Sequence, residues 1–163
     1  MNFSQALLST KCAFKPPIGS MDANRLITVF TEFVGEMHPD TIKAKVLSVY
    51  SDEAYFNDTL KELNGKEAIA DYLEDSLRAT DGVEVKMDDF SRSGIDYYFR
   101  WRMNIKFRSL NRGQPGHSEG MSQVRYNSDM KIVLHRDYWD STTGLFQYIP
   151  MLGSLLAYVR GRI

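Results

Sequence analysis

The stretch Tyr97–Phe107 reads YYFRWRMNIKF, and it decides the fold. Apolar and polar residues alternate along it, which is the period of a β-strand with one buried face. Arg100 and Arg102 are predicted to point outward, and Trp101 and Met103 to point inward. The two faces are Tyr97, Phe99, Trp101, Met103, Ile105 and Phe107 on one side, and Tyr98, Arg100, Arg102, Asn104, Lys106 and Arg108 on the other.

Working outward from this strand, the same period of two recurs on both sides. Val83–Met87 alternates before it, and segments near Ser118–Tyr126 and Lys131–Asp140 follow it. Earlier in the chain the apolar spacing is three and four, which predicts helices carrying Leu26–Met37, 42–50 and 69–77, with a short strand near 54–57. Helices followed by long antiparallel strands indicate the α+β class, with the N-terminal helices packed in a strongly curved, mainly antiparallel sheet.

Composition excludes several classes of protein. The 163 residues carry a formal net charge of −1, which gives no general attraction to nucleic acid or anionic membrane. No window of about 20 apolar residues exists, so stable membrane insertion is not expected. Cys12 is the only cysteine, which excludes an intrachain disulfide and favours a cytoplasmic location. The three histidines show no metal-ligand spacing, so we expect neither a metal nor a cofactor.

Three segments in this order resemble the nuclear transport factor 2-like superfamily, including its ketosteroid isomerase-like and SnoaL-like members. They are Tyr50–Asp58 (YSDEAYFND), Gly65–Ile69 (GKEAI) and His135–Asp140 (HRDYWD). The resemblance covers roughly residues 22–140 and implies a cone-shaped domain, with a pocket between the helices and the curved sheet. It does not select one activity, because one fold hosts many functions.

We predict three parts of the chain. Residues 1–20 form an irregular N-terminal arm, since Pro16-Pro17 and Gly19-Ser20 interrupt any periodic pattern. Residues 21–143 form the nuclear transport factor 2-like domain. Residues 144–163 form an apolar helical segment that covers the mouth of the cone or a subunit interface.

The resemblance also implies candidate catalytic residues. Asp58 matches the general base of ketosteroid isomerase, and Asp137 matches a pocket aspartate of limonene epoxide hydrolase. His135 and Asp137 are two residues apart, so on a strand they share a face, and the aspartate would fix the tautomer of a basic histidine. The alternatives are that Asp58 only begins a turn and that His135 and Asp137 are only a hydrogen-bonded polar pair.

The known chemistries of the superfamily are incomplete in this chain. Ketosteroid isomerase needs a tyrosine and a protonated aspartate, where this sequence has Phe33–Val34 and Ser122. Limonene epoxide hydrolase needs an arginine and an aspartate on the long strand, where Trp101 and Met103 point inward. Scytalone dehydratase needs two pocket histidines, and only His135 is placed for that role.

The function that these residues favour is binding of a small hydrophobic molecule of unknown identity. Trp101, Met103, Ser122 and Trp139 would shape its site. If the protein is an enzyme, we expect an isomerase, dehydratase or hydrolase that transfers protons through Asp58, His135 and Asp137 without a cofactor. The alternative is a non-catalytic binding or interaction module. In either case the resemblance implies a homodimer.

Overall fold

The computed structural model describes residues 1–108, 115–149, 158–159 and 161–162. Its helices are α1 (Phe3–Ser9), α2 (Met21–Gly35), α3 (Pro39–Val49), α4 (Lys66–Arg78) and α5 (Ser141–Gly144), and a 3₁₀ turn, η2, covers Phe146–Tyr148. The strands are β1 (Tyr50–Asn57), β2 (Glu62–Asn64), β3 (Thr80–Ser93), β4 (Asp96–Phe107), β5 (Pro115–Tyr126) and β6 (Ile132–Trp139). This order confirms the predicted α+β class.

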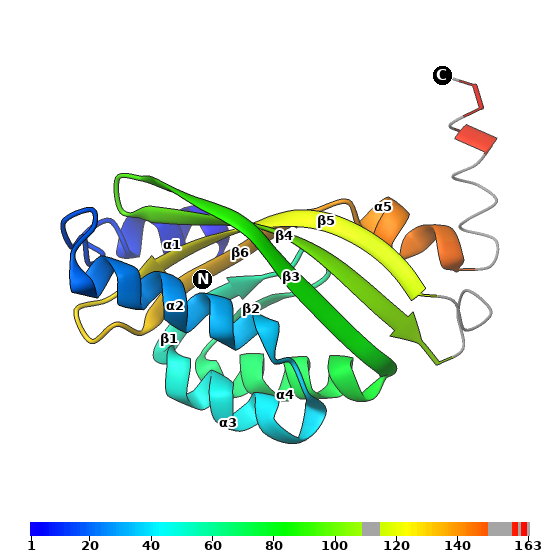
Figure 1. The fold of residues 1–163 in the computed structure, drawn as a ribbon, viewed down its shortest axis with the longest axis horizontal. Coiled ribbons are helices and arrows are strands. Elements are labelled where there is room, and N and C mark those ends of the chain that lie inside the picture. The colour runs from blue at the N-terminus through cyan, green and yellow to red at the C-terminus, as the bar shows by residue number, and fades with distance from the viewer. Residues whose placement is uncertain (109–114, 150–157, 160, 163) are drawn as a thin grey trace.

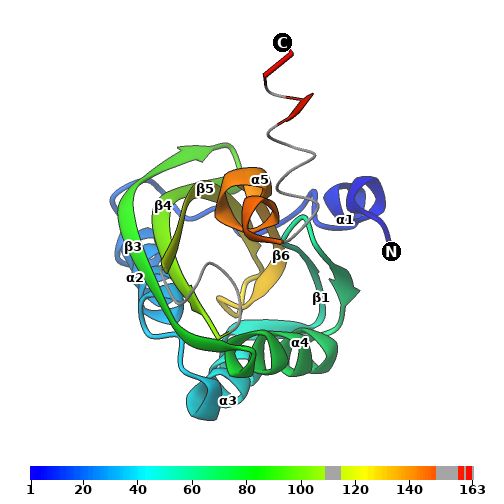
Figure 2. The same ribbon diagram turned by 90° about the vertical axis from the view of Figure 1, so that its right-hand side faces the viewer.

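The six strands form one open, mixed sheet in the order β2-β1-β6-β5-β4-β3. Among the strands of the described residues, β1 and β6 pair in parallel and the other neighbours are antiparallel. The long strands β3, β4 and β5 curve across the helices α2, α3 and α4, as Figures 1 and 2 show. The curvature gives the sheet a concave face toward these helices, which is the predicted cone.

Helix starts follow local capping chemistry. The Ser20 hydroxyl accepts a hydrogen bond from the Ala23 amide at 3.1 Å and caps the start of α2. For α3 the cap is His38, whose Nδ1 accepts from the Asp40 amide at 3.3 Å, with Pro39 in the first turn. Asp40 therefore lies inside the first turn of the helix. Proline fits the first turn because the amide it lacks has no partner there.

The aromatic face of β4 packs on the helices as predicted. Phe99 is fully buried, and its ring lies 4.4 Å from that of Phe30 on α2. On the other face of β4, Arg100 and Arg102 are exposed and form ion pairs with Asp89 and Asp88 of β3. The alternation in the sequence thus separates an apolar core from a charged outer surface.

The N-terminal arm is not irregular throughout, which corrects the prediction. Residues 3–9 form α1, because Asn2 and Gln5 cap its first turn reciprocally at 3.0 and 2.9 Å. The helix lies on the outer side of the sheet, away from α2–α4 (Figure 2), and buries Ala6 completely in a cluster with Tyr55 and Leu134. A seven-residue helix is marginal alone, so this packing holds it.

The predicted C-terminal helical segment falls largely on residues 150–157, 160 and 163, which lie outside the described residues. Its described beginning comprises α5 and η2. Asp140 caps α5 by accepting from the amides of Thr142 and Thr143 at 2.9 and 3.2 Å.

Candidate functional site

A cavity of about 240 Å³ lies between the concave face of the sheet and the helices α2 and α4. Residues on β4, β5 and β6 form one wall, and residues on α2 and α4 form the opposite walls. All seven candidate residues from the sequence border this cavity: Asp58, Trp101, Met103, Ser122, His135, Asp137 and Trp139. Residues far apart in the chain therefore meet at one place.

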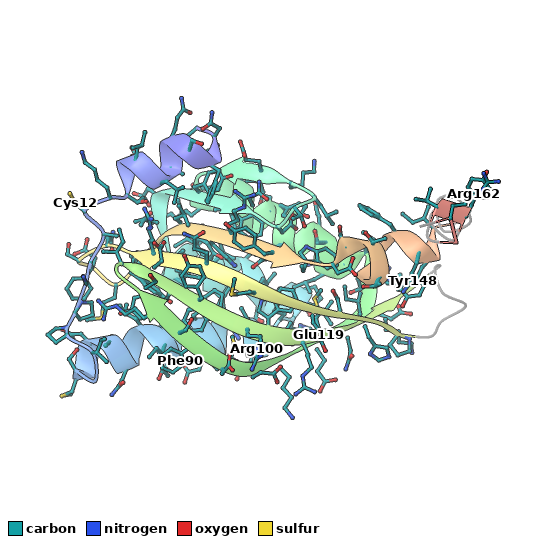
Figure 3. The ribbon with its side chains drawn as sticks, turned by 90° about the horizontal axis from the view of Figure 1, so that it is seen from above. Cys12, Phe90, Arg100, Glu119, Tyr148 and Arg162 are labelled. Atoms are coloured by element: carbon teal, nitrogen blue, oxygen red, sulfur yellow. The ribbon has the colours of Figure 1, made fainter. Side chains whose placement is uncertain are left out.

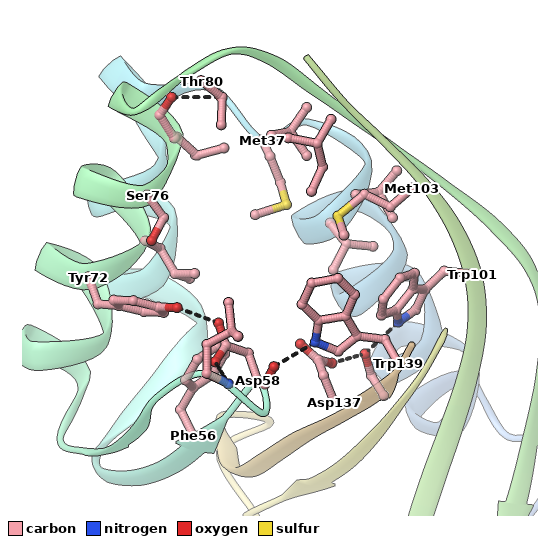
Figure 4. Close-up of a pocket in the computed structure, with 18 of the residues that line it drawn as sticks. Met37, Phe56, Asp58, Tyr72, Ser76, Thr80, Trp101, Met103, Asp137 and Trp139 are labelled. Carbon is pink, nitrogen blue, oxygen red and sulfur yellow. Dashed lines mark hydrogen bonds between the residues drawn. The ribbon is translucent and has the colours of Figure 1, made fainter. Parts of the chain in front are cut away.

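The two ends of the cavity differ in chemistry. Met37, Met103 and Thr80 lie toward one end in Figure 4, with further apolar side chains including Val83, Val85, Ile105 and Phe107 around the cavity. Asp58, Asp137 and Trp139 lie together at the other end. The cavity therefore combines a hydrocarbon-lined region with one localised polar end.

A chain of hydrogen bonds leads to Asp137 at the polar end. Its Oδ1 accepts from the Ser122 hydroxyl at 2.5 Å and pairs with Nε2 of His135 at 2.9 Å. Ser122 in turn accepts from the indole N–H of Trp101 at 2.9 Å. On the other side, the Tyr50 hydroxyl contacts Nδ1 of His135 at 2.5 Å. These contacts fix the carboxylate from two directions.

The carboxylate of Asp137 sets the direction of this chain. A carboxylate oxygen only accepts, so Nε2 of His135 donates to Asp137, and in the tautomer with its single proton on Nε2 the other nitrogen, Nδ1, accepts from the Tyr50 hydroxyl. Burial raises the pKa of Tyr50 well above its ordinary value, and the negative charge of Asp137 raises it further, so Tyr50 keeps the proton that it donates. Both the histidine and Ser122 then donate to the same carboxylate oxygen. Within the described residues, no hydrogen-bond partner contacts the other oxygen, Oδ2.

His135 itself is held inside the protein. Its exposed fraction is 4%, and the rings of Phe30 and Phe56 meet it edge-on at 5.2 and 5.1 Å between centroids. Both ring nitrogens already have partners, Tyr50 and Asp137. The histidine thus positions the carboxylate, and Asp137 is the member of the pair with an oxygen left for a ligand.

Asp58 is fixed by a different set of contacts. Its Oδ1 accepts from the amides of Leu60 and Lys61 at 3.0 and 2.8 Å, which is the predicted turn. Its Oδ2 accepts from the Tyr72 hydroxyl at 2.6 Å. The Trp139 indole donates to the main-chain oxygen of Asp58 at 2.6 Å. The turn and the cavity position, which the sequence presented as alternatives, thus occur together.

Two tyrosines of the site were not among the predicted site residues. The helical periodicity of residues 69–77 predicts Tyr72 only as a packing residue. Tyr50 comes directly after the apolar positions of α3 and is the first residue of β1. Burial raises the pKa of Tyr72, and its hydrogen bond to Asp58 raises it further, so it remains a donor. Tyr50 contacts His135, which lies 85 positions away in the chain. The residues around Tyr50 give no local signal for such a distant partner.

Two glycines permit the close packing around the indoles. A Cβ atom on Gly120 would lie 2.5 Å from the Trp101 ring and 2.8 Å from Cβ of Trp139. A Cβ atom on Gly144 would lie 2.6 Å from the Trp139 ring. These two positions therefore set the walls of the polar end.

The described ranges lack both a metal-binding cluster and a membrane-spanning helix. No group of three or more His, Cys, Asp or Glu side chains there is arranged to hold a metal ion. Among the same residues, no helix has the length and hydropathy needed to span a bilayer. Cys12 is exposed in the segment after α1, at the opposite end of the molecule from Tyr148 (Figure 3).

Comparison with known proteins identifies the family of this chain and structures with a similar fold. The family model for the SnoaL-like domain matches residues 27–135, more than half of the chain. No curated protein matches the sequence. Among solved structures, an M. tuberculosis LEH-like epoxide hydrolase is similar, with a TM-score of 0.61 and 16% identity, over 85% of this chain and 98% of that one.

Two other structures show the same fold. A Catenulispora acidiphila protein with a ketosteroid isomerase-like fold, solved in complex with trimethylamine, has a TM-score of 0.63 and 14% identity, over 76% of this chain and 91% of that one. An NTF2-like protein of unknown function from Burkholderia pseudomallei has a TM-score of 0.65 and 10% identity, over 80% and 99% of the two chains. At these identities the likeness concerns the fold alone.

Proposed function

This chain belongs to the SnoaL-like domain family, and from that premise we propose that it binds a small hydrophobic molecule and transfers a proton with Asp137 as general base. The observation that carries the proposal is the arrangement of the Asp137 carboxylate. His135 and Ser122 hold Oδ1, and Oδ2 has no hydrogen-bond partner among the described residues at the polar end of an apolar cavity. A base needs a fixed position and an accessible lone pair.

In this proposal the two residues of the predicted pair, His135 and Asp137, have different roles. Asp137 takes the proton, and His135 is a positioning residue because both of its ring nitrogens are engaged. The donors Tyr50 and Ser122 complete the support. The reaction classes that a single carboxylate base serves include isomerisation, dehydration and hydrolysis, which were the classes expected from the resemblance.

The hydrogen-bond donors at the polar end favour a second candidate function, in which the protein binds a small molecule without catalysing a reaction. At the polar end, the hydroxyls of Tyr72 and Ser122 and the indoles of Trp101 and Trp139 all donate to protein acceptors already. Within the described part of the chain these groups leave no spare donor for an oxyanion, which most enolate-forming reactions require. The homodimer implied by the resemblance belongs to both candidates.

Ligand binding is tested first with a thermal-shift screen of small cyclic hydrophobic compounds. A compound at 100 times its dissociation constant stabilises the folded state by about 2.7 kcal/mol, which is about 5–10 °C for a chain of this length. A screen in which every compound leaves the melting temperature unchanged would contradict both candidates.

A compound that binds is then incubated with the wild type and with Asp137→Asn. The asparagine Oδ1 can still accept from His135 and Ser122, so the geometry and the binding are retained while the base is removed. We expect turnover to fall by about 10²–10⁴-fold, with Asp89→Asn on the outer surface as the unaffected control. Equal turnover in the wild type and Asp137→Asn would remove the catalytic role, and recovery of unchanged compound from the wild type would favour the binding module.

A further inference from the structure

The polar end of the cavity presents hydrogen-bond acceptors to a ligand. Its two acids are Asp58 and Asp137, and the described residues that border the cavity include neither lysine nor arginine. In the described ranges, the only ion-pair contact of Asp137 is with His135, and Asp58 has none. Asp58 therefore has a negative charge beside the cavity with no cationic partner among the described residues, and a cationic ligand could compensate that charge.

The same end is bordered by aromatic rings. Phe56, Tyr72, Trp101 and Trp139 line it together with the two acids. Aromatic faces attract cations, and tryptophan does so most strongly. Neutral apolar ligands gain from the rings alone, whereas a cation gains from the rings and from the carboxylates.

The negative charges of Asp58 and Asp137 both act on the Tyr72 hydroxyl, which borders the cavity. The charges of Asp58 and Asp137 each contribute to the raised pKa of Tyr72, after burial and after the hydrogen bond to Asp58. The two acids therefore act on the same region. Figure 4 shows them at one end of the cavity, with Tyr72 beside Asp58.

Asp58 is suited to hold a group rather than to react. Three donors fix it, namely the amides of Leu60 and Lys61 and the Tyr72 hydroxyl. A carboxylate has about four lone-pair sites, so it can still accept one further hydrogen bond. Such a fixed anion needs no rearrangement when a ligand arrives.

We propose that the ligand of this cavity is a small apolar amine, whose protonated nitrogen binds at Asp58 between the aromatic rings. The hydrocarbon body then lies toward Met37 and Met103, and Oδ2 of Asp137 is left for the proton transfer proposed above. The cavity of about 240 Å³ is smaller than the roughly 300–1,000 Å³ typical of sites for drug-sized ligands, which limits the body to about one ring. This inference rests on the proposed function and names its ligand class.

The test compares compounds that share one body. Dissociation constants are measured calorimetrically at pH 7 for 2-phenylethylamine, 2-phenylethanol, phenylacetate and ethylbenzene. We expect the amine to bind about tenfold or more tightly than the alcohol, and phenylacetate to bind most weakly. Amine and alcohol of equal affinity would overturn the amine proposal and leave hydrophobic binding standing. If none of the four bound, both proposals would fail.

Asp58→Asn identifies the anchor. The asparagine Oδ1 still accepts from the amides of Leu60 and Lys61, so the turn is kept while the charge is removed. The variant is expected to lose the preference for the amine and to bind 2-phenylethanol as the wild type does, and Asp89→Asn is expected to leave both affinities unchanged. An amine preference that persists in Asp58→Asn would overturn the assignment of Asp58 as the anchor.

Discussion

Acidic residues on the two faces of the sheet have different hydrogen-bond partners. On the outer face, Arg102 of β4 forms a forked pair with Asp88 of β3, with Nε 3.0 Å from both carboxylate oxygens. On the inner face, Asp137 is held by hydrogen bonds with Ser122 and His135, next to apolar walls. The outer acid has an opposite charge and water beside it, whereas the inner acid has neither a lysine nor an arginine among the cavity residues.

This difference indicates what each acid contributes. Exposed ion pairs add little to stability, and their loss is tolerated. A carboxylate beside apolar walls lowers stability unless hydrogen bonds compensate it. The hydrogen bonds from Ser122 and His135 compensate the carboxylate of Asp137 in this way, and the proposed function assigns that carboxylate to ligand chemistry.

The largest effect is expected from Phe30→Ala. Phe30 is fully buried, and its ring contacts those of Phe99 and His135. The cavity left behind should lower the free energy of unfolding by about 3–5 kcal/mol, measured by urea denaturation. Phe90→Ala is the matched control, since that ring is 48% exposed and should cost much less. Similar losses in the two variants would contradict the burial of Phe30 in the core.

A smaller loss is expected from Gly120→Ala. The added methyl group would overlap with Trp101 and approach Trp139, which must both shift. Overpacking of this kind costs about 1–3 kcal/mol. These are the two tryptophans of the chain, so intrinsic fluorescence reports the movement directly. Gly82→Ala has open space around its Cβ and is the control; unchanged fluorescence in Gly120→Ala would show that the packing is looser than described.

Tyr50→Phe tests the inner polar network. The change leaves the buried Nδ1 of His135 without its donor, which should cost about 1–3 kcal/mol of unfolding free energy. Tyr138→Phe removes a hydroxyl that donates to Gln123 at the sheet surface, where the tyrosine is 38% exposed, and should cost less. A larger loss in Tyr138→Phe would reverse the comparison between the two faces.

The smallest effect is expected from Asp88→Asn on the outer face. The hydrogen bond from Arg102 lowers the pKa of Asp88 below its ordinary value of 3.8. The stabilisation is therefore present above pH 3.8 and is lost as the pH falls through the lowered pKa. Melting temperatures of the wild type and Asp88→Asn should differ slightly at pH 7 and converge at acid pH. A difference that grows on acidification would have the wrong sign.

The sequence predicted the sheet better than the site. The alternation in β4 has one physical cause, a sheet with one buried face, so Trp101 and Met103 were assigned inward and Arg100 and Arg102 outward correctly. Helix α1 was missed because its stability comes from Tyr55 and Leu134, which lie far away in the chain. A local pattern reports periodicity, and a short helix held by tertiary contacts leaves little of it.

The seven residues singled out in the sequence border one cavity, but the sequence indicated only part of their contacts and did not indicate Tyr50 and Tyr72. Asp137 and His135 could be paired because they are two residues apart on one strand. The partners that decide their roles, Tyr50 and Ser122, come from other strands. Which nitrogen of His135 carries the proton, on which the proposed role of Asp137 depends, is set by those partners and has no signature in the local sequence.

The most direct test of the account is therefore the protonation pattern of the His135 ring, read from ¹⁵N chemical shifts at neutral pH, with His135→Gln used to assign its signals. The account predicts a neutral ring with its proton on Nε2, donated to Asp137, and an unprotonated Nδ1 that accepts from Tyr50. A proton on Nδ1 with Nε2 unprotonated would make His135 the available base and would contradict the role assigned to Asp137.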